Sequence, residues 1–154
     1  VDVPEKADVL VASCGGFPQD RSLNQATKTI DNIASGLQPG GTLILIIEAR
    51  EGGGPVEYFD WAKDLVAGTI EQRLREHFTV AGYIFFLNCE QAQRYNILLY
   101  SSIAPEDVAP MGIKAFSDVN ALLDAAQLEG KSIYVIPNGS TVIPHVKEAS
   151  KQEA

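Results

Sequence analysis

The sequence predicts an α/β fold, a three-layer sandwich in which helices cover both faces of a mainly parallel sheet. Strand and helix patterns alternate along the chain, and glycine or proline separates most neighbouring elements. The predicted strands are continuous apolar runs, which is typical of strands buried on both faces. Such alternation favours strand–helix–strand units with parallel strands.

The first strand and the first helix have the clearest patterns. Residues 8–13 are apolar and rich in β-branched side chains, so we expect a buried strand there. We expect a helix over residues 22–37, with Ser22 as its N-cap. Apolar side chains recur there every three or four positions and form the stripe of an amphipathic helix: Leu23, Ala26, Ile30, Ile33, Ala34 and Leu37.

Turn residues divide the middle of the chain. The Pro-Gly-Gly at residues 39–41 is expected to end the first helix, and residues 42–48 are expected to form the second strand. The glycine-rich segment 51–55 predicts a loop. A helical stretch follows from about residue 57 to residue 76, with an interruption at Gly68.

The second half contains one ambiguous segment. Residues 82–95 fit either a strand or the start of a helix. Residues 96–101 and 132–136 predict the third and fourth strands. Between them we expect a helix from Ser117, as its cap, to about Gln127. The apolar face of that helix would consist of Val119, Leu122, Leu123 and Ala126.

Length and composition limit the class of protein. A chain of 154 residues, 45% of them hydrophobic, can bury the core of a single domain. We expect that domain over residues 1–144 and a polar, frayed tail over residues 145–154. The net charge of −8 argues against a nucleic-acid partner. The longest apolar run, residues 43–47, is only strand-sized, so no membrane partner is expected.

Cysteine usage and the chain start give two further expectations. Cys14 and Cys89 are too few for a disulfide framework, so we expect a reducing, cytoplasmic location. The chain begins at Val1, and its only methionine is Met111. We therefore expect a processed chain or an excised piece of a larger protein.

Two glycine-containing loops are candidates for ligand binding. Residues 14–21 and 50–54 follow the first two strands, and ligands of open parallel sheets bind beyond the carboxyl ends of the strands. The first loop leads into a helix N-terminus, which favours an anion. On the sequence alone, ordinary turns are the favoured interpretation of both segments. The first has neither a Gly-x-Gly-x-x-Gly fingerprint nor a P-loop.

The polar face of the 22–37 helix is another candidate site. Asn24, Gln25 and Lys28 lie within one turn of each other, and Asn32 and Ser35 continue the same side. A cation beside amide groups suits a carboxylate or a phosphate. On spacing alone, an ordinary solvated helix face is the favoured interpretation, and a ligand site is the alternative.

Other reactive side chains give weaker signals. His77 and His145 have no cysteine or carboxylate at metal-ligand spacing, so no metal site is predicted. Cys14 has no nearby base in the sequence, which favours a small buried residue over a nucleophile. Arg50 could reach a ligand or form a surface ion pair. Trp61 is expected to anchor a helix in the core.

Several motifs in order resemble the C-terminal domain of the nickel-pincer lactate racemase family. Residues 7–28 read ADVLVASCGGFPQDRSLNQATK. In that family a strand ends in Gly-Gly-Tyr/Phe-Pro-Lys-Asp, and a helix with Leu-Tyr-Gln-Ala-x-Lys follows. The Pro-Gly-Gly at 39–41, the acidic-glycine loop at 48–54, the Tyr-Phe-Asp-Trp at 58–61 and the Val-Ile-Pro-Asn-Gly at 135–139 are also similar.

The resemblance implies a Rossmann-like three-layer sandwich that is one half of a 2-hydroxy-acid racemase or epimerase. In that family a nickel-pincer nucleotide takes a hydride from the substrate carbon and returns it to either face. The metal-binding His, the cofactor-tethering Lys and the two acid/base His belong to the N-terminal domain. This domain alone is therefore expected to be inactive, with the N-terminal domain and a small 2-hydroxy acid as its partners. Gly15 and Gly16 are expected to contact the cofactor.

The resemblance also implies substrate contacts for Gln25 and Lys28, with Asn24 beside them. Lys28 would be the cation for a substrate carboxylate or a developing oxyanion, and Gln25 would orient that group. Asn24 stands where the lactate enzyme tends to have Tyr, and residues 89–93 stand roughly where it has a pocket aromatic. We therefore expect a more polar pocket, suited to a larger or more hydrophilic substrate than lactate.

Two functions of other classes remain open on the sequence. One is a nucleotide- or S-adenosylmethionine-binding domain that uses the same glycine loops. The Pro-Gly-Gly at 39–41 is similar to a turn in such methyltransferases, but their acidic glycine-rich loop after the first strand is missing. The other is a non-enzymatic interaction domain that docks a partner on the polar helix face.

Overall fold

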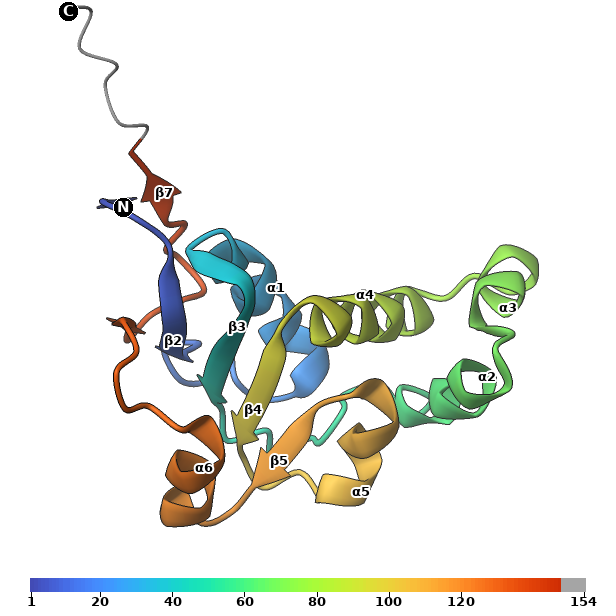
Figure 1. Cartoon of the computed structure of the whole chain (residues 1–154). Helices are drawn as coiled ribbons and strands as arrows, with labels where there is room; N and C mark the ends of the chain where they lie inside the picture. Colours follow the sequence, from blue (N-terminus) through green and yellow to red (C-terminus); the bar gives the residue numbers. More distant parts are fainter. Residues whose placement is uncertain (148–154) are drawn as a thin grey trace, which may run out of the picture.

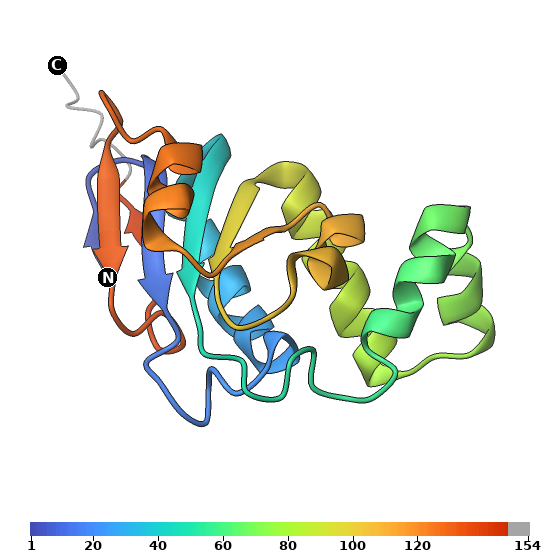
Figure 2. The same cartoon turned by 90° about the horizontal axis from the view of Figure 1, so that it is seen from below.

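The computed structural model describes residues 1–147 and contains a five-stranded parallel sheet in the order β5-β4-β3-β2-β6. Helices cover both faces of this sheet (Figures 1 and 2), which confirms the predicted three-layer α/β sandwich. The strands of the sheet are β2 (Ala7–Ser13), β3 (Leu37–Ile46), β4 (Asn96–Tyr100), β5 (Lys114–Phe116) and β6 (Ile133–Ile136).

The helices lie in three groups. On one face of the sheet are α1 (Leu23–Ala34) and α4 (Val80–Arg94), and on the other face is α6 (Val119–Ala126). Shorter helices extend beyond or join these elements: the 3-10 helix η1 (Phe59–Trp61), α2 (Ala62–Ala67), α3 (Ile70–Glu76), α5 (Pro105–Val108) and the 3-10 helix η2 (Ala109–Met111). None of the helices within residues 1–147 is both long and apolar enough to cross a membrane.

Alternate strand residues form two separate parts of the core. Leu10, Leu43 and Leu99 point to the α1 and α4 side, where they pack in the larger cluster with Ile30. Their neighbours Val9, Ile44 and Leu98 point to the α6 side and contact Leu122 and Ala126. This arrangement follows from the two-residue period of a strand. It explains why these strands read as continuous apolar runs.

The first helix ends earlier than its apolar stripe predicted. Its last residue is Ala34, and Leu37 is the buried first residue of β3. The Pro-Gly-Gly at 39–41 does not end the helix, because it lies inside β3. There the register between β2 and β3 shifts, since Ala7 pairs with Leu37 but Val9 pairs with Thr42. The turn residues therefore mark a bulge in a strand.

The ambiguous segment 82–95 is helical. It belongs to α4, which Thr79 caps by accepting a 3.0 Å hydrogen bond from the backbone N–H of Gly82. Phe85 and Cys89 are buried four residues apart on one side of this helix. The apolar run was ambiguous because half-buried apolar residues also occupy other sides of α4. Trp61 is buried, as predicted, and Gly68 separates α2 from α3 in a left-handed conformation.

The sequence analysis did not predict every element between β4 and β6. The residues that form β5, α5 and η2 were not assigned to any element, and β5 has only three residues. The cap of α6 is Asp118 rather than Ser117, because Asp118 Oδ1 accepts a 2.8 Å hydrogen bond from the backbone N–H of Ala121. Only Leu122 and Ala126 of the predicted apolar face are buried, whereas Val119 and Leu123 are exposed.

The two ends of the described chain lie together. The short strand β1 (Asp2–Val3) pairs in parallel with β7 (His145–Val146). The predicted frayed tail therefore does not begin at residue 145. Residues 148–154 of that tail lie outside the described part of the chain.

Burial of the Cys89 thiol and the Tyr58 hydroxyl predicts a loss of stability at alkaline pH. Burial raises the pKa of the Cys89 thiol from 9.0 to about 12, and it also raises the pKa of the Tyr58 hydroxyl. The unfolded chain therefore releases these protons at lower pH than the folded chain. Below about pH 9 both states keep the Cys89 proton, so this group does not change the free energy of unfolding with pH. As pH rises from 9 toward 12 the unfolded chain loses that proton first, and the free energy of unfolding falls.

Urea unfolding at pH 7, 9 and 10.5 measures this effect. The urea midpoint should fall at the highest pH, and Cys89→Ala should reduce the size of that fall. An equal fall in both proteins would contradict the role of Cys89.

Candidate functional site

The two glycine-containing loops bond to one another at the carboxyl edge of the sheet. The backbone N–H groups of Leu23 and Asn24 donate to the carbonyls of Gly52 and Gly53 at 2.9 and 3.2 Å. The next N–H, of Gln25, donates to Ser22 Oγ at 3.3 Å. The first N–H groups of α1 thus already have protein acceptors. The expectation that this helix N-terminus is free to bind an anion is therefore wrong.

Gly15 lies at the point where the strand order reverses, between β2 and β6. Its φ of +95° is in the left-handed region, and a Cβ at this position would overlap the side chain of Asn138. The N–H of Gly15 donates to Ser13 Oγ at 2.9 Å, and the N–H of Gly139 donates to the Ser13 carbonyl at 2.8 Å. At the crevice where such sheets usually bind ligands, the N–H of Gly15 is therefore already bonded within the protein, although Gly15 itself is exposed.

Gly16 is the more open of the two glycines proposed to contact a cofactor. Its carbonyl accepts hydrogen bonds from the N–H groups of Gln19 and Asp20 at 3.0 and 3.3 Å, which closes a turn. A Cβ at Gly16 would meet no atom within 4 Å, so this side of the turn faces open space. Contact between Gly15 or Gly16 and a cofactor stays a prediction.

The structure divides the predicted polar face of α1 into two parts. Gln25 and Lys28 are exposed, and no ion pair in residues 1–147 involves Lys28. Asn32 Nδ2 instead donates to the Ser140 carbonyl at 3.1 Å, and Ser35 Oγ donates to the Pro144 carbonyl at 2.9 Å. The second part of the face therefore holds the returning C-terminal segment, and only the exposed side chains of the first two turns of α1 are free for a ligand.

Asn24 lies at the start of α1, next to the second glycine-containing loop. Its side chain is half-buried, and a Cβ added to Gly54 would lie 3.3 Å from the Asn24 Cβ. Asn24 Nδ2 is buried and has no hydrogen-bond acceptor among the described residues. A buried donor without an acceptor is costly, so Asn24 is the predicted site residue with an unmet bonding requirement.

Helix α4 places two polar side chains beside this site: Asn88, which the sequence analysis missed, and Gln91, from the 89–93 segment that the resemblance placed near the pocket. Asn88 is fully buried, and its Nδ2 donates to Thr27 Oγ1 and to the Tyr58 hydroxyl, both at 2.8 Å. One turn later, Gln91 Nε2 donates to Asp31 Oδ1 at 2.9 Å. Through Thr27 and Asp31, which flank Lys28 in the sequence, these bonds hold α1 against α4. The only sequence signal for Asn88 was its amide within the apolar run of residues 84–89.

The other reactive residues have structural or surface positions. Cys14 is buried, and this burial raises the pKa of its thiol, which does not suit a nucleophile. His77 is the exposed C-cap of α3. Arg50 Nε lies 2.7 Å from Glu48 Oε1 in an exposed ion pair. Within residues 1–147, no three His, Cys, Asp or Glu side chains are arranged to hold a metal ion.

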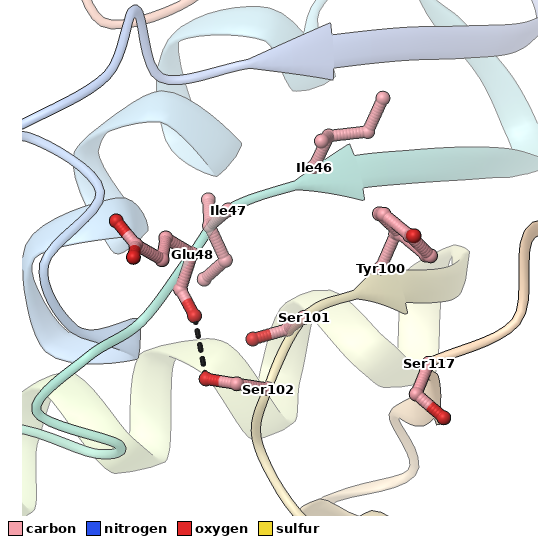
Figure 3. A pocket seen from close by; sticks show the side chains of 7 residues that line it. All are labelled: Ile46, Ile47, Glu48, Tyr100, Ser101, Ser102 and Ser117. Carbon is pink, nitrogen blue, oxygen red and sulfur yellow. Dashed lines mark hydrogen bonds between the residues drawn. The ribbon is translucent and has the colours of Figure 1, made fainter.

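A cavity of about 430 Å³ opens at the carboxyl ends of β3 and β4 (Figure 3). Its polar lining is largely bonded to protein: the Ser102 hydroxyl donates to the Glu48 carbonyl at 2.7 Å, and the N–H of Ile103 donates to Ser101 Oγ at 3.2 Å. No predicted site residue lines this cavity. We therefore place the candidate site on the first turns of α1.

A sequence profile of the lactate racemase C-terminal domain family matches residues 3–144. The chain belongs to this family. A curated lactate racemase from Thermoanaerobacterium thermosaccharolyticum is 29% identical to it over 58 residues, which are 38% of this chain and 14% of that protein.

Solved structures show the same fold. The lactate racemase apoprotein from Thermoanaerobacterium thermosaccharolyticum superposes with a TM-score of 0.79 and 22% identity, over 94% of this chain and 37% of that chain. A protein from Thermotoga maritima superposes with a TM-score of 0.63 and 14% identity, over 96% of this chain and 39% of that chain. The chain thus spans well under half the length of each of these relatives.

Proposed function

We propose that this chain is the substrate-covering C-terminal domain of a racemase or epimerase for a 2-hydroxy acid. The family match over residues 3–144 supports a racemase-related domain. The observation that carries the assignment to a site is the exposed Lys28, which has no ion pair within residues 1–147 and lies one turn from Gln25. A free cation and a free amide on one rigid helix suit a carboxylate.

The proposed roles follow from these positions. The Lys28 ammonium binds the substrate carboxylate or the oxyanion that develops at the reacting carbon. Gln25, three residues earlier on the same face, donates from its amide and orients the same group. We assign Asn24 Nδ2, which is buried and has no acceptor among residues 1–147, as a third donor to the substrate.

The described residues do not fit a nickel site of their own. Within residues 1–147 there is no cluster of metal-ligating side chains, and both cysteines are buried. We therefore assign the nickel-pincer nucleotide, and the hydride transfer associated with it, to a separate N-terminal domain of the same polypeptide. No step of that chemistry is assigned to this chain, which we expect to be inactive alone. Gly15 and Gly16 are proposed only to approach the cofactor from this side.

The polar character of the site favours a hydrophilic substrate. The side chains nearest the proposed carboxylate position are an amine and two amides, and Gln91 and Asp31 form the neighbouring seam between α1 and α4. Hydroxyl groups of a substrate could bond to such a surface, whereas a methyl group would gain nothing from it. We propose a 2-hydroxy acid that is larger or carries more hydroxyls than lactate. The proposed location is the cytoplasm, because both thiols are unpaired.

A substrate panel tests this proposal. The full-length polypeptide would be produced together with the enzymes that make the pincer nucleotide, and each enantiomer of lactate, of larger 2-hydroxy acids and of sugar acids would be followed by chiral chromatography. We expect interconversion, with a sugar acid or another hydroxyl-rich acid as the best substrate. Lactate as the best substrate would contradict the proposed substrate class. No interconversion across the panel would contradict the racemase itself.

A further inference from the structure

Residues 59–83 form an arm that consists of η1, α2, α3 and the first turn of α4. Few side chains of this arm are buried. Its helices extend beyond α4, away from the sheet, in both views (Figures 1 and 2). Among residues 62–76, only Ile70 is buried. Helices of six and seven residues are not stable without tertiary contacts. The arm therefore needs support from outside its own helices.

Trp61, at the base of the arm, supplies this support because its ring is buried in the main core cluster on the α1 and α4 side of the sheet. The indole ring lies so close to Gly82 of α4 that a Cβ there would overlap it. The Arg73 guanidinium lies 4.2 Å from the ring centroid and pairs with Asp64. These contacts hold α2, α3 and α4 in one orientation. The arm is thus a fixed projection rather than a loose loop.

The outer side of the arm exposes apolar side chains that this packing leaves out. Phe78 and Val80 are 64% and 67% exposed, and the Phe78 and Tyr83 rings lie 5.9 Å apart. Beside these rings is a hollow of about 410 Å³ between α3 and α4, which Leu74 and Phe86 also line. A rigid, exposed aromatic cluster next to a hollow is typical of a protein–protein interface.

Helix α4 connects this aromatic cluster directly to the candidate site. Its first turn contacts Trp61, and its later turns bond to α1 through Asn88 and Gln91. The 15 residues of α4 span roughly 22 Å. One protein body of domain size can therefore cover both the exposed end of α1 and the arm. Most of the length of lactate racemase lies outside the part that this chain matches.

We propose that the aromatic cluster (Leu74, Phe78, Val80, Tyr83 and Phe86) is the docking surface for the N-terminal domain of the full-length polypeptide. This inference rests on the proposed function, because that function supplies the occupant. Of the charged residues that line the hollow, Glu71 and Arg75 pair with each other, whereas Glu90 has no ion pair among residues 1–147. The fitting surface is therefore apolar, with a basic residue opposite Glu90. Docking there sets the distance between the N-terminal domain and Lys28.

Cysteine labelling of the full-length polypeptide tests the proposal. Phe78→Cys places a thiol in the cluster. Val135→Cys places one on the edge strand β6, on the α6 side of the sheet, because Val135 pairs with Val11, which packs in the α6 cluster. Val135 is 68% exposed, close to the 64% of Phe78. Both native cysteines are buried and give little background reaction. We expect the maleimide rate of Phe78→Cys to be more than about tenfold below that of Val135→Cys, at every protein concentration. Val80→Cys serves as a second probe of the cluster.

Each other outcome overturns the docking proposal. Equally rapid labelling of Phe78→Cys and Val135→Cys means that nothing covers the cluster. Protection that grows with protein concentration means that a second copy covers it. Protection of Val135→Cys alone places the interface on the α6 side. The labelling needs neither cofactor nor substrate, so it tests the docking separately from the activity. An active racemase in which Phe78→Cys labels rapidly contradicts only the docking. An inactive protein in which Phe78→Cys is protected contradicts only the proposed activity.

Discussion

Replacing Lys28 with alanine in the full-length polypeptide should lower kcat/KM for the 2-hydroxy acid by about 100-fold or more. The reason is the loss of the only cation on the free part of α1, among the described residues. The side chain is exposed and forms no ion pair within residues 1–147, so its removal should leave the free energy of unfolding nearly unchanged. Steady-state racemisation rates and a thermal melt measure the two effects separately.

A matched control is Lys114→Ala, because Lys114 is also exposed but lies on β5 at the far edge of the sheet. Its kcat/KM should stay within about twofold of the unmodified enzyme. Lys28→Arg keeps the charge and should recover part of the activity, with a different geometry of carboxylate contact. Full activity in Lys28→Ala would remove Lys28 from the site. An equal loss in Lys28→Ala and Lys114→Ala would show a general effect of surface charge.

Gly82→Ala should destabilise the chain by about 2–3 kcal/mol, which lowers Tm by roughly 5–10 °C. An alanine in a helix normally stabilises it relative to glycine by about 1 kcal/mol. Here the added Cβ would overlap the Trp61 ring, which is buried and cannot move aside freely. The expected sign is therefore opposite to that of helix propensity. Trp61 is the only tryptophan of the chain, so its fluorescence reports on this contact during unfolding.

The control for Gly82→Ala is Gln93→Ala, at an exposed position of the same helix. It should change Tm by no more than a degree or two, because it removes only surface atoms. If Gly82→Ala raised Tm as propensity alone predicts, the close packing of α4 on Trp61 would be incorrect. The same result would weaken the argument that the arm has a fixed orientation.

The order of strands and helices follows from local sequence patterns. The predicted strands at 8–13, 96–101 and 132–136 agree with β2, β4 and β6 to within one residue at each end. Parallel central strands are buried on both faces, so their apolar runs are visible without any knowledge of their neighbours. The exposed positions of Gln25 and Lys28 follow in the same way from the apolar stripe on the opposite side of their helix.

Contacts between distant segments decided the features that local patterns could not show. The N-terminus of α1 is closed by carbonyls from the loop at 52–53, and Asn32 is bonded to Ser140, 108 residues away. Asn88 and Gln91 reach the site only because α4 packs beside α1.

The sequence by itself thus determined the fold class, the family and a candidate cation. The tertiary structure decided which polar groups remain free. A hydrogen-bonding side chain can be satisfied by any segment that folding brings near, and its spacing along the chain does not record that partner.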